Sequence, residues 1–503
     1  MLTRQKMDSV PQSSGPTVLL INPCYDKADA LGPFSSHISS QLPMSLGFLA
    51  GYLLQKNIGV HIVDEQLRRI DEEDLLKGIE EHDTKVVGIS VLTLTAPRAY
   101  ELGAFLKRSC PSVKVVMGGV HVTLLPEEPL VSGCADVVVR GEGELTLHEL
   151  VERIHDGFPY GDVRGISRIE DGRVIHGPER PMIDDLDTLP PFPYHLFEPH
   201  RERYQFGNML TSRGCPYDCI FCSQRAVSGH RYRARSAGKI FEELETLVFD
   251  YGQDFVFIND DNFVVDKDNI YALCDLIDRR ELPERVRIGF HARGDALDAP
   301  LLRRMRNARF AIVMIGFETG SERIMAMVRK GETVREIEEG VRIAKECGMV
   351  VGGQFILGFP TETRAESLQT IRHALRLPID FTRFNLLLPY PGTEVFRMLE
   401  ESGGTRSRNW AHYATHAGLT GKVIPYVPEG RSAWELRLLQ WFAHLAFFLR
   451  PKQLLDLGNM KYATAGQLHL PDPKSFRGAL SLAGFMTRLL LSMVQGLLKK
   501  RQS

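Results

Sequence analysis

The stretch GCPYDCIFC, residues 214–222, holds three of the eight cysteines of this 503-residue chain, Cys215, Cys219 and Cys222. A C-x3-C-x2-C spacing is too tight for one disulfide and one unpaired cysteine to be the natural interpretation. It suits three thiolates that bind one face of an iron–sulfur cluster. Such clusters are normally held by four cysteines, but the next cysteine along this chain is Cys274. The alternatives are a zinc knuckle, whose usual second half is missing, and unpaired core thiols. The spacing therefore indicates a cluster with three protein ligands and one open iron.

The composition is that of an ordinary globular protein. Hydrophobic residues make up 43% and charged residues 25% of the chain. The formal net charge of -2 argues against a nucleic-acid partner, because generic nucleic-acid binders are basic. Residues 1–16 have no apolar core and predict a disordered N-terminus rather than a secretory signal. No run of about 18 uncharged apolar residues occurs, so we expect a cytoplasmic protein without disulfides.

Downstream of the cysteines, apolar strands alternate with amphipathic helices. This alternation predicts βαβ units and a parallel sheet. Six such units are too few for a closed barrel of eight strands, and ligands in barrels of this type bind at the carboxyl ends of the strands. The expected strands lie at residues 204–215, 254–260, 286–293, 310–318, 350–360 and 380–393.

The cysteine spacing, with Phe221 directly before the last cysteine, resembles the radical S-adenosylmethionine (AdoMet) superfamily. The resemblance implies a partial (β/α)6 barrel of the TIM type over residues 201–395. It also implies that Cys215, Cys219 and Cys222 are the metal ligands and catalytic residues of a 4Fe-4S cluster, with Phe221 among the cofactor-binding residues. In that family, the cluster takes an electron from a flavodoxin or ferredoxin type of donor. It passes the electron to AdoMet, whose C–S bond breaks to give a 5′-deoxyadenosyl radical.

The segment GFETGSE, residues 316–322, is similar to the family motif that follows the fourth barrel strand. The resemblance implies that Gly316 and Gly320 let the backbone approach AdoMet, because glycine has no Cβ. Glu318 would accept a hydrogen bond from a ribose hydroxyl. For each of these residues, the alternative is a plain turn or a helix cap.

Two further strand ends carry charged candidates. The segment NDDNF, residues 259–263, follows the second strand, and Asp260 or Asp261 would there accept from the AdoMet ammonium group. Arg293 follows the third strand and would pair with the AdoMet carboxylate through its two-pronged guanidinium. Turns and helix caps are again the alternatives.

Residues 17–150 predict a second α/β unit, a doubly wound sheet of Rossmann-like type. Its ligands are expected at the carboxyl ends of the strands. No turn spells G-x-G-x-x-G, so a nicotinamide cofactor is not indicated. The expected strands are 17–23, 60–64, 86–93, 113–121 and 135–144. The candidate ligand-binding residues at their ends are Ser90, Thr93, Gly118 and Gly119.

A Rossmann-like unit ahead of the cysteine barrel resembles the layout of cobalamin-binding radical AdoMet enzymes. That group includes the anaerobic magnesium-protoporphyrin ester cyclase and cobalamin-dependent methyltransferases. The segments GISVLT (88–93), GGVH (118–121) and RGEGE (140–144) look like its cobalamin-domain signposts. The motif D-x-H-x-x-G, whose histidine binds cobalt in many cobalamin proteins, is absent. The alternative is a Rossmann-like unit that has lost cobalamin.

The remaining segments predict a linker and a helical tail. Residues 151–200 form the linker, with a β-hairpin at the Asp171–Gly172 turn signal and stiffening prolines after it. Residues 396–503 predict a helical C-terminal region. Its segment 476–501 is an amphipathic helix with a basic end, which suits packing on protein or peripheral contact with a membrane.

Together these features predict a cobalamin-dependent radical AdoMet enzyme that methylates an unactivated carbon of a small substrate, with lipid-like or tetrapyrrole-like molecules as one class. One alternative is a radical oxidative cyclase or ring-rearranging enzyme. A tRNA methylthiotransferase would need closely spaced N-terminal cysteines and a basic tail module, which this chain lacks. A non-catalytic cobalamin or iron–sulfur sensor is the alternative from another class. Substrate identity, oligomeric state, the lower cobalt ligand and the residue that quenches a final radical are not predicted.

Overall fold

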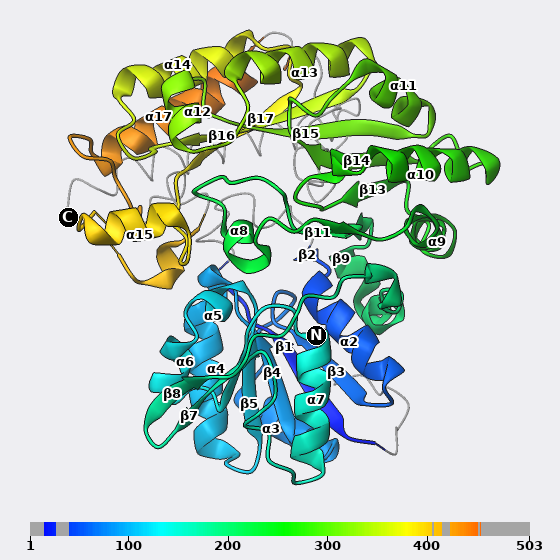
Figure 1. Ribbon diagram of the computed structural model, residues 1–503, viewed down its shortest axis with the longest axis vertical. Coiled ribbons are helices and arrows are strands. Elements are labelled where there is room, and N and C mark those ends of the chain that lie inside the picture. Colours follow the sequence, from blue (N-terminus) through cyan, green and yellow to red (C-terminus); the bar gives the residue numbers. More distant parts are fainter. Residues whose placement is uncertain (1–14, 27–39, 405–406, 415–422, 451–452, 454–503) are drawn as a thin grey trace, which may run out of the picture. The chain divides into compact units, whose positions relative to one another are not determined.

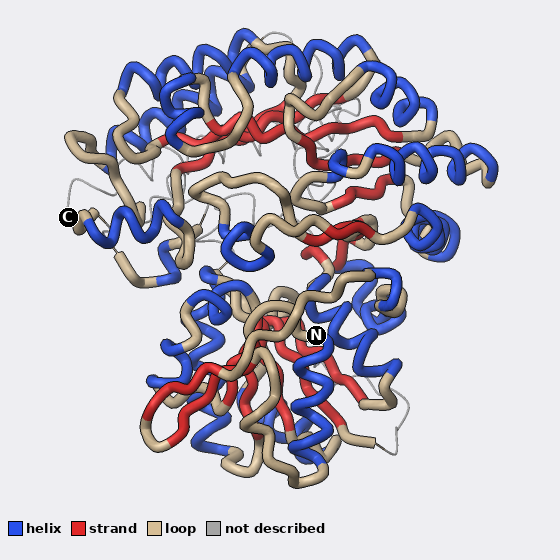
Figure 2. Tube along the Cα trace, viewed as in Figure 1, coloured by secondary structure: helices blue, strands red, loops and turns tan. Residues whose placement is uncertain are grey.

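The computed structural model describes residues 15–26, 40–404, 407–414, 423–450 and 453 (Figure 1). The chain divides into two compact units. The first is built mainly from residues 15–25 and 42–204, and the second mainly from residues 205–225 and 229 onward. Each unit has its own sheet (Figure 2).

The first unit is a seven-stranded sheet with the order β3-β1-β4-β5-β6-β7-β8. Its first five strands are parallel, and β7 and β8 form an antiparallel hairpin that extends the sheet beyond β6. Both turn residues of the hairpin, Asp171 and Gly172, have positive φ, as a two-residue hairpin requires. The strands are β1 (Thr17–Asn22), β3 (Gly59–Asp64), β4 (Val86–Ser90), β5 (Lys114–Gly118), β6 (Val137–Val139), β7 (Ile166–Glu170) and β8 (Arg173–His176).

The parallel strands read as runs of Val, Ile and Leu because helices cover both faces of the sheet. Alternate strand residues such as Val18, Leu20 and Val60 pack with α2 (Met44–Gln55) and α7 (Glu144–His155) in one buried cluster. The other helices of the unit are α3 (Glu72–Glu81), α4 (Ala96–Ser109), α5 (Val120–Leu124) and α6 (Glu127–Val131).

The strand order of the first unit reverses at β1, which pairs with β3 on one side and with β4 on the other. In a doubly wound sheet, the crevice at the carboxyl ends of the strands flanking such a reversal is the expected ligand site. That edge carries the ends of β1, β4 and β5, where the candidate residues Ser90, Thr93, Gly118 and Gly119 lie.

The second unit contains a six-stranded parallel sheet with the order β10-β13-β14-β15-β16-β17. Strand order follows chain order, so each helix between two strands returns the chain to the next position, as in an open (β/α)6 barrel. The strands are β10 (Asn208–Met209), β13 (Phe255–Ile258), β14 (Arg287–Ala292), β15 (Phe310–Glu318), β16 (Val350–Leu357) and β17 (Phe381–Leu386). The short pair β11 (Ser212–Arg213) and β12 (Arg233–Ala234) and helix α8 (Ser223–Ser228) frame the cysteine loop.

Helices cover one side of this sheet, as Figure 1 shows for α10, α11, α13, α14 and α17. Their starts follow from the sequence: Thr333 and Thr363 form capping boxes with Glu336 and Glu366. The helices are α9 (Ala237–Glu245), α10 (Lys267–Arg279), α11 (Ala299–Asn307), α12 (Glu322–Met327), α13 (Val334–Glu346), α14 (Arg364–Arg376), α15 (Glu394–Glu401) and α17 (Ala433–Phe448).

Helix α17 covers β17, the last strand in the order of this sheet. The Phe384 backbone N–H donates to His444 Nε2 over 3.3 Å, and Gln440 Nε2 donates to the Phe384 carbonyl oxygen over 2.7 Å. The Nδ1 of His444 lies 2.8 Å from the Gln440 carbonyl oxygen, so this nitrogen carries the proton. Burial accordingly lowers the pKa of His444 to about 4. Two side chains of one helix thus satisfy backbone groups that an edge strand leaves open.

The predicted fold class is confirmed: a Rossmann-like unit, a partial barrel and a helical C-terminal region. The hairpin predicted at residues 171–172 belongs to the first sheet. The domain limits drawn from the sequence stay predictions. The predicted helix at 476–501 and residues 1–14 of the N-terminal segment lie outside the described residues. Within the described ranges, no helix is both long enough and apolar enough to cross a membrane.

Candidate functional site

The cysteine loop, residues 214–222, follows β11 and is tied to two distant segments through its backbone. The Ile220 N–H donates to the Val328 carbonyl oxygen over 3.1 Å, and the Ile220 carbonyl accepts from the Val395 N–H, also at 3.1 Å. These three side chains pack in one buried cluster, against which Phe221 also lies. Phe221 makes an edge contact with Phe359, with ring centroids 5.6 Å apart. The loop is thus held at its middle, between the cysteines.

Charged side chains brace the same loop. The Arg293 guanidinium lies 3.7 Å from the ring centroid of Tyr217, which stands between the first two cysteines. Asp218 pairs with Arg225 and, over 3.4 Å, with Arg329 Nη1. The guanidinium–ring stack and the ion pairs fix the loop from both sides, as a ligand loop without secondary structure requires.

The three thiols are free and partly exposed. The charge of Cys222 acts on Cys219, and that of Cys215 acts on Cys222, so the thiols lie near one another. Burial raises the pKa of each thiol, that of Cys219 to about 12. A coordinating metal reverses this effect, because metal-bound thiols are deprotonated.

The donor set fits an iron–sulfur cluster better than a single ion. Within the described residues, no three His, Cys, Asp or Glu side chains converge as the ligands of one metal ion would. A cluster needs no such convergence, because its thiolates bind different irons. Three thiols on one braced loop therefore fit a cluster with three protein ligands, and their assignment as ligands stays a prediction of the sequence.

The two candidate aspartates after β13 have different surroundings. Asp260 is buried, and it accepts from the Thr211 N–H over 2.7 Å, from the Thr211 hydroxyl, and from Ser212 Oγ over 2.6 Å. It therefore pins the strand that enters the cysteine loop. Asp261 is exposed and has no hydrogen-bond partner among the described residues. Surrounding protein atoms and, next, the charge of Asp260 raise the pKa of Asp261 to about 6. Of the two, Asp261 is the one free to meet a ligand.

Arg293 makes its two-pronged contact inside the protein. Its Nε and Nη2 donate to Asp295 over 3.0 and 2.9 Å, and its Nη1 donates to the Lys330 carbonyl oxygen. The predicted fork to the AdoMet carboxylate is therefore already used for Asp295. Contact between Arg293 and AdoMet stays a prediction, and the observed role of this residue is to support the cysteine loop.

Glu318 ends β15 in the left-handed backbone region, with φ of 59°, next to a register shift against β16. Its Oε1 accepts from Lys330 Nζ over 2.9 Å. A Cβ on Gly316 would lie 2.4 Å from this Oε1 and 3.0 Å from Lys330 Nζ. Gly316 is therefore needed to make room for the Glu318–Lys330 pair, and the ribose contact predicted for Glu318 stays a prediction.

Gly320 also has an internal reason to be glycine. A Cβ there would lie 2.9 Å from His373 Cβ and 3.0 Å from Thr370 Cα, both in α14. The Gly320 N–H donates to Thr370 Oγ1 over 2.9 Å. Close packing of α14 thus explains this glycine without a ligand, and the predicted approach of AdoMet at Gly320 remains untested.

Sequence patterns did not reveal the charged residues that surround the cysteine loop. Lys330, Glu332 and Asp295 join Arg293 and Glu318 in one ionic network, which is buried except at Asp295. Lys330 and Glu332 stand in the short connection between α12 and α13, where charged residues are normally solvated, so the sequence offers no distinguishing signal.

The turn GFPTET, residues 358–363, follows β16 and is held by Glu362, a residue that the sequence analysis did not single out. Glu362 accepts from the backbone N–H groups of Gly358 and Phe359, and it lies 3.8 Å from Arg431 Nη1. Burial raises the pKa of Glu362 to about 7. This carboxyl group therefore stabilises the turn at the carboxyl end of β16.

In the first unit, the two candidate glycines have different surroundings. Gly119 has φ of 108°, and a Cβ on it would lie 2.8 Å from the Val91 carbonyl oxygen. A Cβ on Gly118 would meet no atom closer than 3.8 Å. Gly119 is thus required by the turn itself, whereas a Cβ on Gly118 would make only ordinary van der Waals contact with Val139 at the end of β5.

Ser90 is partly exposed at the end of β4, whereas the hydroxyl of Thr93 faces inward. Thr93 Oγ1 lies 3.3 Å from His121 Nδ1, and His121 Nε2 lies 3.3 Å from Glu128 Oε2. Tyr100 donates to the same Glu128 oxygen over 3.1 Å. This chain of contacts, buried at Thr93 and His121, joins the loops after β4 and β5. Thr93 therefore has a structural role, and its contact with a ligand stays a prediction.

A second buried group at this edge was not predicted. Arg98 donates to Glu65 through Nε and Nη2, with distances of 3.0 Å to Oε2 and 2.6 Å to Oε1. Glu65 also accepts from the backbone N–H groups of Cys24 and Ile70. The pair therefore fastens the loops after β1 and β3.

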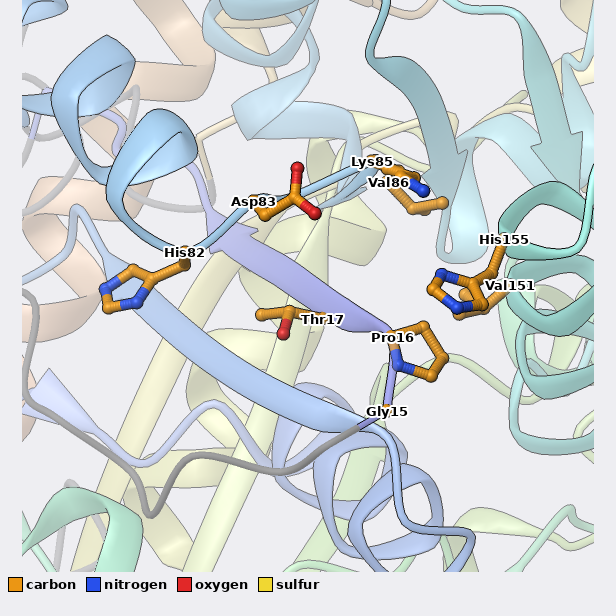
Figure 3. Close-up of a pocket in the computed structure, with 9 residues that line it drawn as sticks. All are labelled: Gly15, Pro16, Thr17, His82, Asp83, Lys85, Val86, Val151 and His155. Carbon is orange, nitrogen blue, oxygen red and sulfur yellow. The ribbon is translucent and has the colours of Figure 1, made fainter.

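A cavity of about 230 Å³ lies at the opposite edge of this sheet (Figure 3). Its lining includes Thr17 and Val86 at the amino ends of β1 and β4, with His82, Asp83 and His155 around them. Ligands of doubly wound sheets bind at the carboxyl ends. This cavity is therefore separate from the candidate cofactor edge.

Comparison with known proteins identifies both units. The model of the radical SAM superfamily matches residues 209–374, and that of the B12 binding domain matches residues 40–151. The uncharacterized methyltransferase PH0819 of Pyrococcus horikoshii is 33% identical over 419 residues, which are 82% of this chain and 89% of that protein. The chain belongs to the radical SAM superfamily, in the group with a B12 binding domain.

Two other relatives are more distant. The anaerobic magnesium-protoporphyrin IX monomethyl ester cyclase of Cereibacter sphaeroides is 27% identical over 376 residues, 71% of this chain and 60% of that enzyme. The radical SAM methyltransferase TsrM of Kitasatospora setae, solved with cobalamin and a [4Fe-4S] cluster bound, superposes with a TM-score of 0.70. The match covers 95% of this chain and 99% of TsrM at 19% identity, so it establishes the fold.

Family membership confirms the predicted cofactors and enzyme class. A radical SAM domain uses a 4Fe-4S cluster and AdoMet, and a B12 binding domain holds cobalamin. This radical SAM protein is therefore an enzyme of the cobalamin-dependent methyltransferase type, and it acts on a small molecule with electrons from a reductant.

Proposed function

We propose that this radical SAM enzyme transfers a methyl group to an unactivated carbon of a small molecule and that Cys215, Cys219 and Cys222 hold its cluster. The observation that carries the proposal is the cysteine loop itself. It presents three free thiols at the carboxyl-end side of the barrel strands, where barrel enzymes bind their ligands. When bound, the cluster and AdoMet supply the radical that removes a hydrogen atom, and cobalamin supplies the methyl group.

The residues around the loop would hold AdoMet in the orientation that cleavage requires. The exposed Asp261 carboxylate can accept from the AdoMet ammonium group, and its charge also acts on Cys215 and Cys222, which places it beside the loop. Glu318 has one carboxylate oxygen on Lys330, which leaves the other oxygen for a ribose hydroxyl. Phe221 and the segment from Gly316 to Gly320 would form the apolar and backbone wall behind the nucleoside.

In the first unit, we propose that cobalamin lies across the carboxyl edge at Ser90, Thr93, Gly118 and Gly119. The reversal of strand order at β1, next to β4 and β5, supports this position, because ligands of doubly wound sheets bind at the carboxyl ends beside such a reversal. The chain of contacts from Thr93 through His121 to Glu128 would keep the two neighbouring loops in place beside the cofactor.

The relatives point to one class of substrate ahead of another. One relative is a magnesium-protoporphyrin ester cyclase, which supports a tetrapyrrole-like substrate, and a lipid-like substrate is the second choice. We propose a flavodoxin or ferredoxin type of protein as the electron donor. The same relative makes oxidative cyclisation the second candidate reaction, because it shares both units with this chain.

The test separates the two reactions without knowledge of the substrate. Anaerobic protein containing cluster and cobalamin is reduced and given AdoMet with a deuterated methyl group. Methyl transfer predicts S-adenosylhomocysteine together with the deuterium label on protein-bound cobalamin, read by mass spectrometry. A cyclase predicts 5′-deoxyadenosine with no label on cobalamin, and that result would overturn the methylation proposal.

A further inference from the structure

A buried lysine stands beneath the cysteine loop. The Lys330 side chain is 7% exposed, and its Nζ lies 2.9 Å from Glu318 Oε1 and 3.4 Å from Glu332 Oε1. Glu332 is itself fully buried as a side chain. Burial acts to lower the pKa of Lys330, but Glu318 and then Glu332 outweigh it, so the pKa rises and the ammonium stays charged.

The segment around Lys330 is attached to the cysteine loop at three points. The Val328 carbonyl accepts from the Ile220 N–H, and Arg329 pairs with Asp218. The Lys330 carbonyl accepts from Arg293, whose guanidinium stacks on Tyr217. Lys330 is therefore fixed relative to the cysteines by both its backbone and its side chain.

The Lys330 charge lies within reach of the thiols. It acts on Cys219, for which it is the strongest charged neighbour, and also on Cys215, for which Asp261 and Arg293 come before it. Glu318 also acts on Cys219. The ammonium therefore pairs with the Glu318 carboxylate, and both charged groups lie near the Cys219 thiol.

A buried cation in this place has a physical consequence. Desolvating an ammonium costs several kcal/mol unless it is paired, so a lysine that served packing alone would be replaceable by an apolar residue. A cluster bound by thiolates gains negative charge when it takes an electron, and its potential depends on nearby charge and solvent exposure. A fixed cation beside it stabilises the reduced form, because Coulomb interactions are strong where water is excluded.

We infer that Lys330 is a positioning residue with two effects: it stabilises the reduced cluster and it fixes Glu318 for AdoMet. The inference rests on the proposed assignment of the three cysteines. It predicts that Lys330 changes the electronic properties of the cluster without being a ligand of it.

The experiment compares Lys330→Met with Lys330→Arg, Glu318→Gln and the double variant Glu318→Gln/Lys330→Met in anaerobically reconstituted full-length protein. Iron and sulfide content, the midpoint potential of the cluster by EPR-monitored titration, and the dissociation constant of AdoMet are measured for each. Lys330→Met is expected to keep its iron but to shift the potential to more negative values. Its affinity for AdoMet should fall roughly tenfold, the lower end of what outer-shell changes cost at metal sites.

Lys330→Arg keeps a positive charge and should restore most of the potential, which a purely structural role would not require. Glu318→Gln should weaken AdoMet binding while it leaves the potential at or above that of the wild type. If Lys330→Met loses its cluster through misfolding, the double variant removes the Glu318 charge together with that of Lys330. It then tests the potential with Glu332, which also lies 4.0 Å from Arg293 Nη2, as the one carboxylate of this group that has lost Lys330.

The matched control is Lys345→Met. Lys345 pairs with Asp380 over 2.6 Å at the amino ends of β16 and β17, whereas the cysteine loop lies on the carboxyl-end side of the barrel strands. The midpoint potential of the cluster should therefore not change in this variant. An unchanged potential and unchanged AdoMet affinity in Lys330→Met, or in the double variant, would overturn the inference. A wild-type protein that binds no cluster would instead overturn the proposed function, so the two failures are distinguishable.

Discussion

Two buried ion pairs stand at the carboxyl ends of parallel strands, and they differ in how completely the protein uses them. In the first unit, Glu65 receives a two-pronged contact from Arg98 and two backbone N–H groups, so both of its oxygens are engaged inside the protein. In the second unit, Glu318 shares one oxygen with Lys330, and the pair lies next to cysteine thiols. The Glu65–Arg98 pair therefore holds loops of the fold together, whereas Glu318 keeps one carboxylate oxygen that can bind a ligand.

The same contrast separates two neighbouring residues. Asp260 has three hydrogen bonds and no exposed surface to offer, whereas Asp261 is exposed and lies beside the thiols. Counting the internal partners of a polar group thus distinguishes a residue that holds the fold from one that can hold a cofactor. Both comparisons can be tested by substitution.

The largest effect is expected at the cysteines. Cys219→Ala removes one of three proposed cluster ligands, so iron content should drop and 5′-deoxyadenosine production should fall to background. Cys347→Ala is the control, because Cys347 is also a partly exposed free thiol but lies after α13, outside the cysteine loop. Full 5′-deoxyadenosine production by Cys219→Ala would contradict the assignment.

The Glu65–Arg98 pair should matter for stability alone. Arg98→Met leaves Glu65 buried without its cation, which is expected to destabilise the first unit by about 3 kcal/mol. The midpoint of urea unfolding, followed by circular dichroism, measures this loss. Correctly folded Arg98→Met protein should still cleave AdoMet at the wild-type rate. A selective loss of cleavage would show that the Glu65–Arg98 pair also contributes to the reaction.

The aspartate pair should divide stability from binding. Asp260→Asn removes the negative charge that accepts hydrogen bonds from Thr211 and Ser212. It should lower the free energy of unfolding by roughly 2 kcal/mol. Asp261→Asn should leave the unfolding midpoint unchanged or raise it, because the raised pKa of Asp261 means that its charge does not stabilise the fold. It should weaken AdoMet binding by about tenfold, since a hydrogen bond to a charged group contributes roughly 1.5–3 kcal/mol. Calorimetric titration with AdoMet and urea unfolding measure the two effects, and equal effects of both substitutions would refute the distinction.

The smallest effect is expected at Glu366, which caps α14 through Thr363 and pairs with Arg323 and Ser321 at the surface. The Arg323 hydrogen bond is the main reason that the pKa of Glu366 falls from 4.5 to about 2. A carboxyl group whose folded-state pKa is depressed stabilises the fold above its unfolded-state pKa and loses that contribution as the pH falls. Glu366→Gln should therefore cost about 1 kcal/mol at neutral pH. The gap to wild type should close between pH 4.5 and 2.

Urea midpoints of both proteins at several pH values test this prediction. A stability difference that stays constant down to the acid end of the range would mean that the Glu366 charge contributes nothing and that only the shape of the side chain matters.

Local sequence features allowed much of the fold to be predicted. Alternating apolar strands and amphipathic helices gave six barrel strands and the Rossmann-like unit, and the C-x3-C-x2-C spacing marked the loop that the structure braces. Helices α3 and α7 were not predicted. The strands and helices that were predicted could be located because the period of the apolar residues reflects which face of an element is buried.

The charged framework of the site could not be predicted. Glu318 and Lys330 are 12 residues apart, and Glu65 and Arg98 are 33 apart. Their pairing depends on how strands and connections meet in three dimensions, which no local pattern encodes. The same limit explains why the sequence did not show that the Arg293 guanidinium holds Asp295 and stacks on Tyr217, while its contact with AdoMet stays a prediction.

The most direct test of the central claim is the cofactor content of protein purified without oxygen from cobalamin-fed cells, by absorbance, iron analysis and mass spectrometry. We predict one cobalamin and about four irons per chain, the content of a single 4Fe-4S cluster. An intact cluster without cobalamin would contradict the account, because the first unit would then serve another purpose and methyl transfer through cobalt would be lost. Cobalamin without iron would contradict the assignment of the cysteine loop.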